Sequence, residues 1–232
     1  MVRGLYSAAG GMLATSQQQD VTAHNLAHAN KPGFRREILR FDATGPASDL
    51  VAPSVQLHTD QSVGDLDHTG QPLDLAINGA GFFTVQGPGG SLYTRCGVFQ
   101  RNGEGQIVTP EGLAVLGQAG PIQVPAEATS IEILDDGSVL ADGKEIDQLS
   151  LATFTNDQNL QRVGSTYFAA PSGTQPTVGD ARVQQGYREM ANTSAVHEMV
   201  QMTAGLRQFE ATQRALRSIG DSLALATRPS GR

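Results

Sequence analysis

Apolar side chains recur every seven residues at both ends of this 232-residue chain, whereas the middle lacks that period. The stripe positions are Leu5, Met12 and Leu26 near the N-terminus and Met202, Phe209, Leu216 and Leu223 near the C-terminus. A seven-residue period places these side chains on one face of a helix, which then needs a partner to cover it. The pattern predicts two terminal helices on either side of a different kind of fold.

The first 29 residues predict a helix that is weak by itself. Its stripe includes the polar Gln19, and the pair Gly10-Gly11 weakens the helix by about 1 kcal/mol per glycine. Lys31-Pro-Gly33 ends it, because the residue before proline avoids helical backbone and glycine tolerates a left-handed turn. We expect this helix to become ordered when other subunits cover its apolar face.

Residues 194–226 predict a longer helix, because they contain neither proline nor a turn cluster. About 30 helical residues span roughly 45 Å, which exceeds most helices in globular domains and is typical of a coiled-coil strand. Thr193 or Ser194 is suited to cap its first turn, and Glu198 places a negative charge there. Met199 and Leu206 extend the apolar stripe of this helix.

The middle of the chain indicates an all-β unit. Short apolar runs alternate with turns that contain glycine, such as Asn102-Gly103, Asp136-Gly137 and Asp142-Gly143. Asn-Gly and Asp-Gly favour tight hairpins because both positions tolerate positive φ. The runs are 75–77, 82–85, 105–108, 131–134, 138–140 and 149–154. The expected fold class is therefore α+β, in which long terminal helices pack as a coiled-coil-like pair beside a central β domain.

Four segments describe the expected organisation. Residues 40–72 are rich in Asp, Ser, Thr, Gly and Pro, and we interpret them as an extended connector with little regular structure. The segments are an N-terminal assembly helix and turn (1–39), the connector (40–72), the β domain (73–187) and a C-terminal assembly helix (188–232).

The net charge of −7 is unevenly distributed. Residues 1–40 carry five basic and two acidic side chains, residues 188–232 carry six and four, and the stretch between them carries five and seventeen. The acidic middle argues against nucleic acid as a partner, because phosphate binding needs a basic surface. No apolar run approaches the roughly 20 residues that span a bilayer, so we expect no direct membrane insertion. The first residues do not form a cleavable signal peptide, so any export is expected to leave them in place.

Enzymatic interpretations find little support in the residue patterns. His24 and His28 are four residues apart, as helical metal ligands are, but no third ligand is indicated. An acidic loop is a simpler interpretation of Asp65, Asp67 and Asp74 than an acid/base pair is. We therefore predict no catalytic residue, no metal and no cofactor.

Two N-terminal motifs carry a specific resemblance. The chain contains Leu-Tyr-Ser-Ala-Ala-Gly-Gly-Met-Leu over residues 5–13 and Asn-Leu-Ala-His-Ala-Asn-Lys-Pro-Gly-Phe over residues 25–34. Both resemble the start of the rod and hook proteins of the bacterial flagellum. His28 stands where that family commonly has asparagine.

Further segments resemble the same family in the same order. Residues 72–83 with Tyr93-Thr-Arg95 are similar to the opening of its β domain. Gln185-Gly-Tyr187, Asn192 and Glu198-Met-Val200 are similar to the entry into its C-terminal helix. The resemblance therefore covers both ends and the middle of the chain.

The resemblance implies a non-enzymatic subunit of the flagellar basal-body rod, exported and placed where the rod crosses the periplasm. The short connector and Gly120-Pro-Ile-Gln-Val-Pro125 favour a proximal over a distal rod position or a hook-like one. Implied partners are copies of itself, other rod subunits and the flagellar export apparatus. The predicted assembly residues are Leu5, Met12, Leu26, Met199, Met202, Leu206, Phe209, Leu216 and Leu223, and the N-terminal motif residues are Asn25, Asn30, Gly33 and Phe34.

An alternative of another class is a carbohydrate-binding or hydrolytic β module on a coiled coil. Such a module would present exposed aromatic side chains for sugar stacking, or a pocket lined by carboxylates. The chain has no Trp and only four Tyr, which counts against this alternative.

Overall fold

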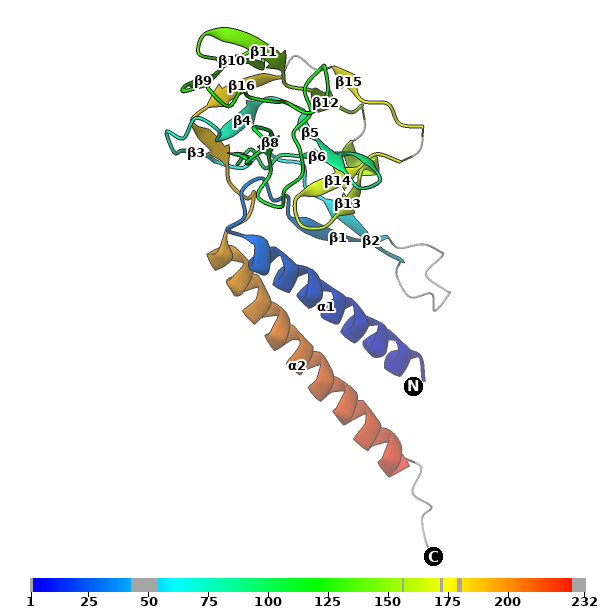
Figure 1. The fold of residues 1–232 in the computed structure, drawn as a ribbon. Coiled ribbons are helices and arrows are strands. Elements are labelled where there is room, and N and C mark those ends of the chain that lie inside the picture. The colour runs from blue at the N-terminus through cyan, green and yellow to red at the C-terminus, as the bar shows by residue number, and fades with distance from the viewer. Residues whose placement is uncertain (1, 43–53, 156, 172, 179–180, 227–232) are drawn as a thin grey trace, which may run out of the picture. The chain divides into compact units, whose positions relative to one another are not determined.

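The computed structural model describes residues 2–42, 54–155, 157–171, 173–178 and 181–226. Contacts within the chain divide it into two compact units. The first unit comprises 1–27, 37–60 and 193–232, and the second comprises 28–36 and 61–192. Each unit is thus built from segments that are far apart in the sequence (Figure 1).

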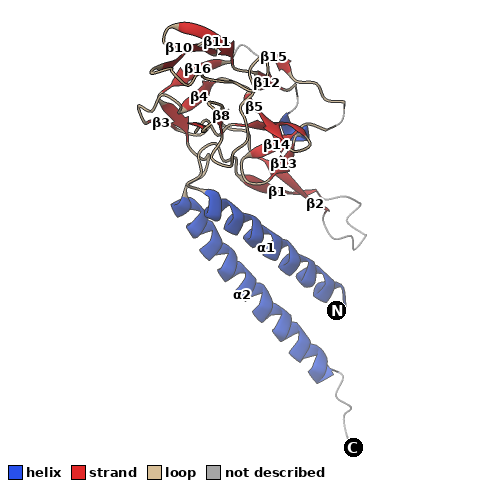
Figure 2. Cartoon of the chain, in the orientation of Figure 1, coloured by secondary structure: helices blue, strands red, loops and turns tan. Residues whose placement is uncertain are grey.

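The first unit contains the two long helices and one strand pair. These elements are α1 (Val2–His28), β1 (Glu37–Asp42), β2 (Ser54–Thr59) and α2 (Ala195–Ala226). Strands β1 and β2 are antiparallel, with Glu37 opposite Thr59. Figure 2 shows the two helices in blue and the strands in red. The predicted terminal helices are confirmed, with ends that differ from the predicted ones by one or two residues.

The start of α2 is capped by its own side chains. The Ser194 hydroxyl oxygen accepts the backbone N–H of His197 at 3.2 Å, and the Ser194 carbonyl oxygen accepts that of Glu198 at 3.0 Å. The Thr193 hydroxyl donates to Oε1 of Glu198 at 2.6 Å. Of the two predicted caps, Thr193 and Ser194, the structure confirms Ser194, because its hydroxyl satisfies a backbone N–H that the first turn leaves open.

The second unit is built from short strands. They are β3 (Leu66–His68), β4 (Leu75–Asn78), β5 (Phe82–Gly87), β6 (Gly90–Thr94), β7 (Gln100–Arg101), β8 (Ile107–Val108), β9 (Ile131–Ile133), β10 (Ser138–Ala141), β11 (Lys144–Gln148), β12 (Leu151–Thr153), β13 (Gln161–Val163), β14 (Tyr167–Ala169), β15 (Thr177–Val178), β16 (Arg182–Gln185) and β17 (Tyr187–Glu189), with a 3₁₀ turn η1 (Asp157–Asn159). The largest sheet has six strands in the order β13-β14-β6-β5-β12-β15. A three-stranded sheet has the order β11-β10-β9, and three strand pairs are β16-β4, β17-β3 and β7-β8.

Aliphatic and phenylalanine side chains fill the core of this unit. The main cluster includes Leu75, Phe83 and Val139, each at most 1% exposed. A second cluster packs around Phe82 and Phe168, whose ring centroids lie 5.7 Å apart. Most members of both clusters come from the predicted apolar runs and from the strands of the same sheets, which confirms the α+β class. The segments between strands supply the others, which are Phe99, Val115, Ile122, Val124 and Leu160.

The predicted Asp-Gly turns form hairpins. Asp142 has φ 50° and Gly143 has φ 79° between the antiparallel strands β10 and β11. Positive φ at both central residues is the geometry that matches the twist of a two-residue hairpin.

The expectation of little regular structure in residues 40–72 is wrong where β1, β2 and β3 lie. The described part of this segment pairs: β2 with β1, and β3 with β17, which comes more than 100 residues later in the chain. Residues 43–53 of the predicted connector lie outside the described residues. Pairing between distant segments leaves no local pattern, which is why composition suggested a loop.

Candidate functional site

The side chain of Asn25 holds the backbone beyond α1. Its Nδ2 donates to the carbonyl oxygen of Glu37 at 2.9 Å, and its Oδ1 accepts the N–H of Glu37 at 2.8 Å. Asn25 is 1% exposed, whereas Asn30 is exposed. The amide therefore acts as a strand partner for Glu37, the first residue of β1.

Replacing Asn25 by alanine is expected to lower the free energy of unfolding by about 2–3 kcal/mol, because two buried hydrogen bonds are lost and the Glu37 backbone groups remain unpaired. The amide of Glu37 should then exchange faster with solvent deuterium. Asn30→Ala, at an exposed position, is the control and is expected to change stability by less than about 0.5 kcal/mol. Equal effects of the two changes would contradict this role of Asn25.

The turn that follows α1 belongs to the second unit, and Gly33 and Phe34 anchor it there. Gly33 has φ 68°, and its N–H donates to the Glu189 carbonyl oxygen at 2.7 Å. Phe34 is fully buried. The guanidinium carbon of Arg162 lies 5.2 Å from the centre of the Phe34 ring and 5.1 Å from that of Phe168, close enough for cation–π attraction.

Three charged side chains, Arg35, Arg95 and Glu189, meet next to this turn, and we call them the buried triad. Nη1 of Arg35 lies 2.8 Å from Oε1 of Glu189, and Nη1 of Arg95 lies 3.2 Å from Oε2. Relative exposure is 1% for Arg35, 4% for Arg95 and 0% for Glu189. Burial lowers the pKa of Arg95, while attraction to Glu189 opposes that change. Because one carboxylate serves two guanidiniums, each member depends on the others for compensation.

Backbone groups complete the surroundings of the buried triad. The N–H of Gly64 donates to Oε1 of Glu189 at 3.0 Å, and Arg35 donates to the carbonyl oxygen of Ser62. Arg95 donates to the carbonyl oxygen of Gly79 at 2.6 Å. These bonds offset part of the cost of burying three charges.

Asn192 connects the N-terminal turn to the strand that leads toward α2. Its Oδ1 accepts the N–H of Arg36 at 2.7 Å, and its own N–H donates to the Phe34 carbonyl oxygen at 3.2 Å. Its Nδ2 donates to the carbonyl oxygen of Ser62 at 3.1 Å. One asparagine thus joins three segments of the second unit.

The predicted assembly residues differ in exposure along the helices. Met12, Leu26, Met202, Phe209 and Leu216 are half-buried. Met199 is 53% exposed and Leu206 is 48% exposed. The side chains of Leu5 and Leu223 lie outside the described part of the chain.

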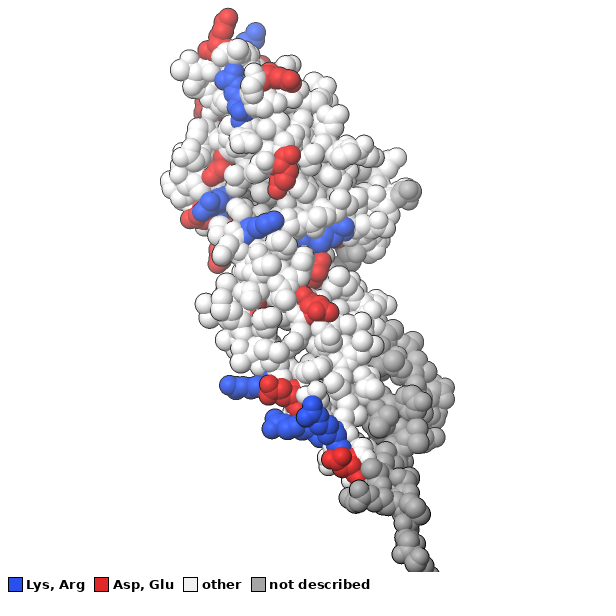
Figure 3. Space-filling view, turned by 60° about the horizontal axis from the view of Figure 1, so that its bottom comes forward, with Lys and Arg blue, Asp and Glu red and all other residues white. Residues whose placement is uncertain are grey.

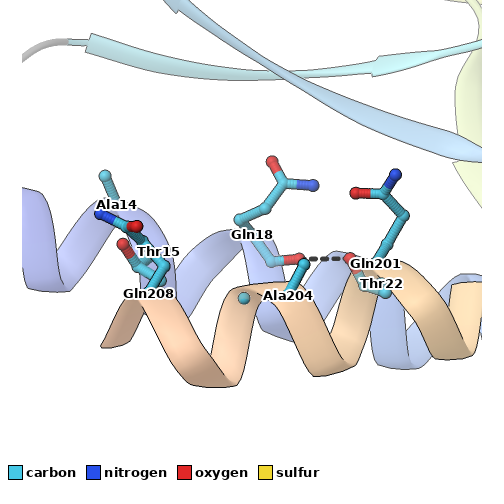
Figure 4. Close-up of a pocket in the computed structure, with 8 residues that line it drawn as sticks. Ala14, Thr15, Gln18, Thr22, Gln201, Ala204 and Gln208 are labelled. Carbon is cyan, nitrogen blue, oxygen red and sulfur yellow. Dashed lines mark hydrogen bonds between the residues drawn. The ribbon is translucent and has the colours of Figure 1, made fainter. Parts of the chain in front are cut away.

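Small and uncharged residues of both helices line a groove of about 510 Å³ in the first unit. The lining residues, which define the groove, are Ala14, Thr15, Gln18 and Thr22 on α1 and Gln201, Ala204, Gly205 and Gln208 on α2. Figure 4 shows the amides of Gln18 and Gln201 extending to the same side, and the Thr22 hydroxyl donating to the Gln18 carbonyl oxygen at 2.9 Å. A side chain on Gly205 would approach Nε2 of Gln19 to 3.2 Å.

Comparison with known proteins matches three parts of the chain to flagellar families. Residues 5–35 match the flagella basal body rod protein family, residues 76–141 match the flagellar hook protein FlgE/F/G D1 domain, and residues 184–228 match the C-terminal region of flagellar basal body rod FlgEFG proteins.

Individual relatives match almost from end to end. The flagellar basal-body rod protein FlgF of Escherichia coli (strain K12) is 35% identical and the alignment covers 96% of both chains. FlgG of Bacillus subtilis (strain 168) is 31% identical over 93% of this chain and 94% of its own. FlgF of Mesorhizobium japonicum is 30% identical over 96% and 95%. This chain belongs to the flagellar basal-body rod protein family.

The buried triad of this rod-family protein takes one residue from each matched segment. Arg35 ends the N-terminal match, Arg95 lies in the D1 match and Glu189 lies in the C-terminal match. Sequence reasoning included Arg95 in a motif but missed the triad. Arg35 directly follows Phe34, and Glu189 lies two residues after Tyr187, but these positions in the sequence do not indicate that the three side chains meet.

Two hollows on the β domain of this rod-family protein bear on the carbohydrate alternative. One, of about 380 Å³, is lined by residues that include Thr84, Tyr93 and Ser150 and by no carboxylate. The other, of about 410 Å³, has Asp74 as its single acidic lining residue. Neither offers the paired carboxylates that sugar hydrolysis requires.

In the described segments of this rod-family protein, no three side chains of His, Cys, Asp or Glu gather as metal ligands. No helix in these segments is long and apolar enough to cross a bilayer.

Proposed function

We propose that this protein is a structural subunit of the rod of the flagellar basal body and that it assembles through α1 and α2. The observation that carries the proposal is the meeting of all three family segments at one buried triad, combined with similarity along nearly the whole length of rod proteins. A chain that keeps the complete framework of rod proteins is suited to the same mechanical task. The names of its relatives describe structural parts and no catalysis.

The proposed assembly surface consists of the apolar stripes of the two helices. Met199 and Leu206 remain about half exposed in the single chain, and Met12, Met202 and Phe209 are only partly covered. Burying apolar area of this kind contributes about 25 cal/mol per Å². Neighbouring subunits would supply that burial, and the coiled-coil-like packing of α1 with α2 belongs to this proposal.

The remaining parts of the proposal concern place and partners. Proposed partners are copies of the chain, other rod subunits and the export apparatus, and the proposed location is the basal body, reached without cleavage of a signal peptide. A proximal position is favoured by the short segment between β1 and the β domain. FlgF and FlgG relatives both match with about 30–35% identity, which supports the rod as a whole.

Removal of the gene followed by isolation of basal bodies tests the proposed function. We expect basal bodies without a complete rod and cells that do not swim, both restored by the parent gene. Normal rods in the deletion strain would overturn the proposal. Expression of a variant with a stop codon after residue 190 is a matched control, because it keeps the β domain but lacks α2.

A further inference from the structure

Four dipeptides of this chain have the composition that most readily closes a cyclic imide between a side chain and the next backbone nitrogen. In that reaction the nitrogen of the glycine attacks the side-chain carbonyl carbon of the Asn or Asp before it. Glycine favours the attack, because no side chain stands beside its nitrogen and its backbone is adaptable. A hydrogen bond that holds the Asn or Asp side chain elsewhere opposes it. The dipeptides are Asn78-Gly79, Asn102-Gly103, Asp136-Gly137 and Asp142-Gly143.

The side chain of Asn102 is held within its own turn. Its Oδ1 accepts the N–H of Glu104 at 3.0 Å and that of Gln106 at 2.8 Å. Its Nδ2 donates to Oε1 of Gln106 at 3.3 Å. These hydrogen bonds have to break before the amide carbon can reach the nitrogen of Gly103, so we expect this site to react slowly in the folded chain.

The two Asp-Gly side chains are also held by hydrogen bonds. Oδ1 of Asp136 accepts the N–H of Ser138 at 2.9 Å. Oδ1 of Asp142 accepts the N–H of Ser130 at 2.9 Å. These bonds lower the pKa of both carboxyl groups and keep them ionised at neutral pH. A carboxylate is a poor electrophile, so both Asp-Gly sites are expected to be slow as well.

Asn78 differs from the other three side chains. It is exposed at the end of β4, and within the described part of the chain its side chain has no hydrogen-bond partner. The space next to it is open. A Cβ atom added at Gly79 would lie 4.0 Å from the nearest atom beyond the neighbouring residues, which is Cα of Ala181. The cyclic imide therefore has room at Asn78-Gly79.

The backbone on both sides of Asn78 binds a member of the buried triad. Nη1 of Arg95 donates to the carbonyl oxygen of Ile77 at 3.2 Å, and Nη2 of Arg95 donates to that of Gly79 at 2.6 Å. The two carbonyl groups can hold one guanidinium only while the chain between them keeps its normal length. A change in the backbone at Asn78 therefore reaches the triad.

We propose that Asn78-Gly79 is a site of spontaneous deamidation and that its isoaspartate product loosens the hold of the backbone on Arg95. As the bond between the Gly79 nitrogen and Cγ of Asn78 forms, the amide nitrogen takes up the proton of that N–H and leaves as ammonia. Water then opens the imide at either carbonyl group, which gives aspartate or isoaspartate. In isoaspartate the main chain runs through the side chain and is longer by one methylene. This chemistry is independent of the role in the rod.

Incubation of the purified full-length chain at neutral pH, with and without guanidinium chloride, tests the reactivity of the site. Trypsin cleaves after Arg95 and Arg101, so the two Asn-Gly sites fall in different peptides for mass spectrometry. In denaturant both sites should react at the same rate, because the dipeptide is the same. In the folded chain Asn78 should react at least about tenfold faster than Asn102, because each hydrogen bond that must break raises the barrier.

Urea denaturation of the reacted chains tests the consequence for Arg95. Chains with isoaspartate at position 78, separated by ion exchange, should unfold at a urea concentration lower by about 0.5–1 M, because a hydrogen bond to a charged group is lost. Asn78→Asp is the matched control, since it adds the charge without lengthening the chain. Figure 3 shows acidic and basic side chains interspersed on one face of the molecule, and solvent screens exposed charges. Freshly purified Asn78→Asp should therefore unfold like the parent.

Asn78→Gln completes the set, because its longer side chain closes an imide much more slowly. This variant should stay unmodified at position 78 and keep the urea midpoint of the fresh parent throughout the incubation. Equal rates at Asn78 and Asn102 in the folded chain would overturn the assignment of the site. Isoaspartate chains that unfold at the same urea concentration as Asn78→Asp would overturn the link to Arg95.

Discussion

Replacing Glu189 by alanine is expected to lower the free energy of unfolding by about 3–5 kcal/mol, because two buried guanidinium groups lose their shared carboxylate. Glu189 is fully buried, and its oxygens lie 2.8 Å from Arg35 and 3.2 Å from Arg95. Urea denaturation followed by circular dichroism measures the change, and the transition of the β domain should move to lower urea concentration. Few single substitutions have effects this large.

A partly exposed ion pair next to Glu189 in the chain, Arg188 with Asp67, offers a matched control. Arg188 and Asp67 form a pair at 2.7 Å with side chains 37% and 46% exposed. Solvent screens such pairs, so Asp67→Ala is expected to cost less than about 1 kcal/mol. If Asp67→Ala and Glu189→Ala destabilise the chain equally, burial of the triad does not govern its energetics.

The buried triad matters for function because of where its members come from. Arg35 immediately follows the N-terminal motif, and Glu189 precedes the segment that enters α2. Loss of Glu189 would therefore weaken the attachment of the N-terminal turn and of the strand β17 to the β domain. We expect a Glu189→Ala rod subunit to be less abundant in isolated basal bodies than the parent, in proportion to its lower stability.

Replacing Gly33 by alanine is expected to lower the free energy of unfolding by about 2–5 kcal/mol, for two physical reasons. Gly33 has φ 68°, which costs a residue with a Cβ atom. That Cβ would also lie 2.2 Å from the backbone nitrogen of Cys96 and 2.4 Å from the carbonyl carbon of Arg95. Backbone atoms cannot rotate away as a side chain can, so the turn must shift. Chemical denaturation of the purified variant measures the loss.

Gly112 separates the two causes. It has φ 87°, but an added Cβ there would meet no atom within 4 Å. Gly112→Ala should therefore cost only the conformational part, about 1–2 kcal/mol. If Gly33→Ala and Gly112→Ala lower the free energy of unfolding by the same amount, the close approach to Cys96 does not contribute to the cost.

Features that depend on short stretches of sequence could be predicted well. The helix over Ala195–Ala226 follows from a long segment without proline and from Ser194 at its start, and the hairpin at Asp142 follows from a dipeptide that tolerates positive φ. The turn at Gly33 likewise follows from its neighbours Lys31 and Pro32. In these places local backbone preference and the final structure agree.

Features that depend on distant segments could not be predicted. Strand β3 pairs with β17, and nothing in the composition of residues 66–68 indicates that partner. The stripe residues of α2 also differ in how exposed their side chains are. Met202 and Phe209 are partly buried, whereas Met199 is 53% and Leu206 is 48% exposed. A seven-residue period defines a helical face but does not say how much of that face its own chain covers.

By itself, the sequence determined the terminal helices, the β domain between them and the motifs that resemble rod proteins, because periodicity, capping and turn preferences act over a few residues. Only the tertiary structure decided that Arg35, Arg95 and Glu189 share one buried site and that Asn25 serves Glu37 as a strand partner. Burial and ion pairing depend on which segments fold together across the chain, and that information is spread over many weak contacts rather than held in any one motif.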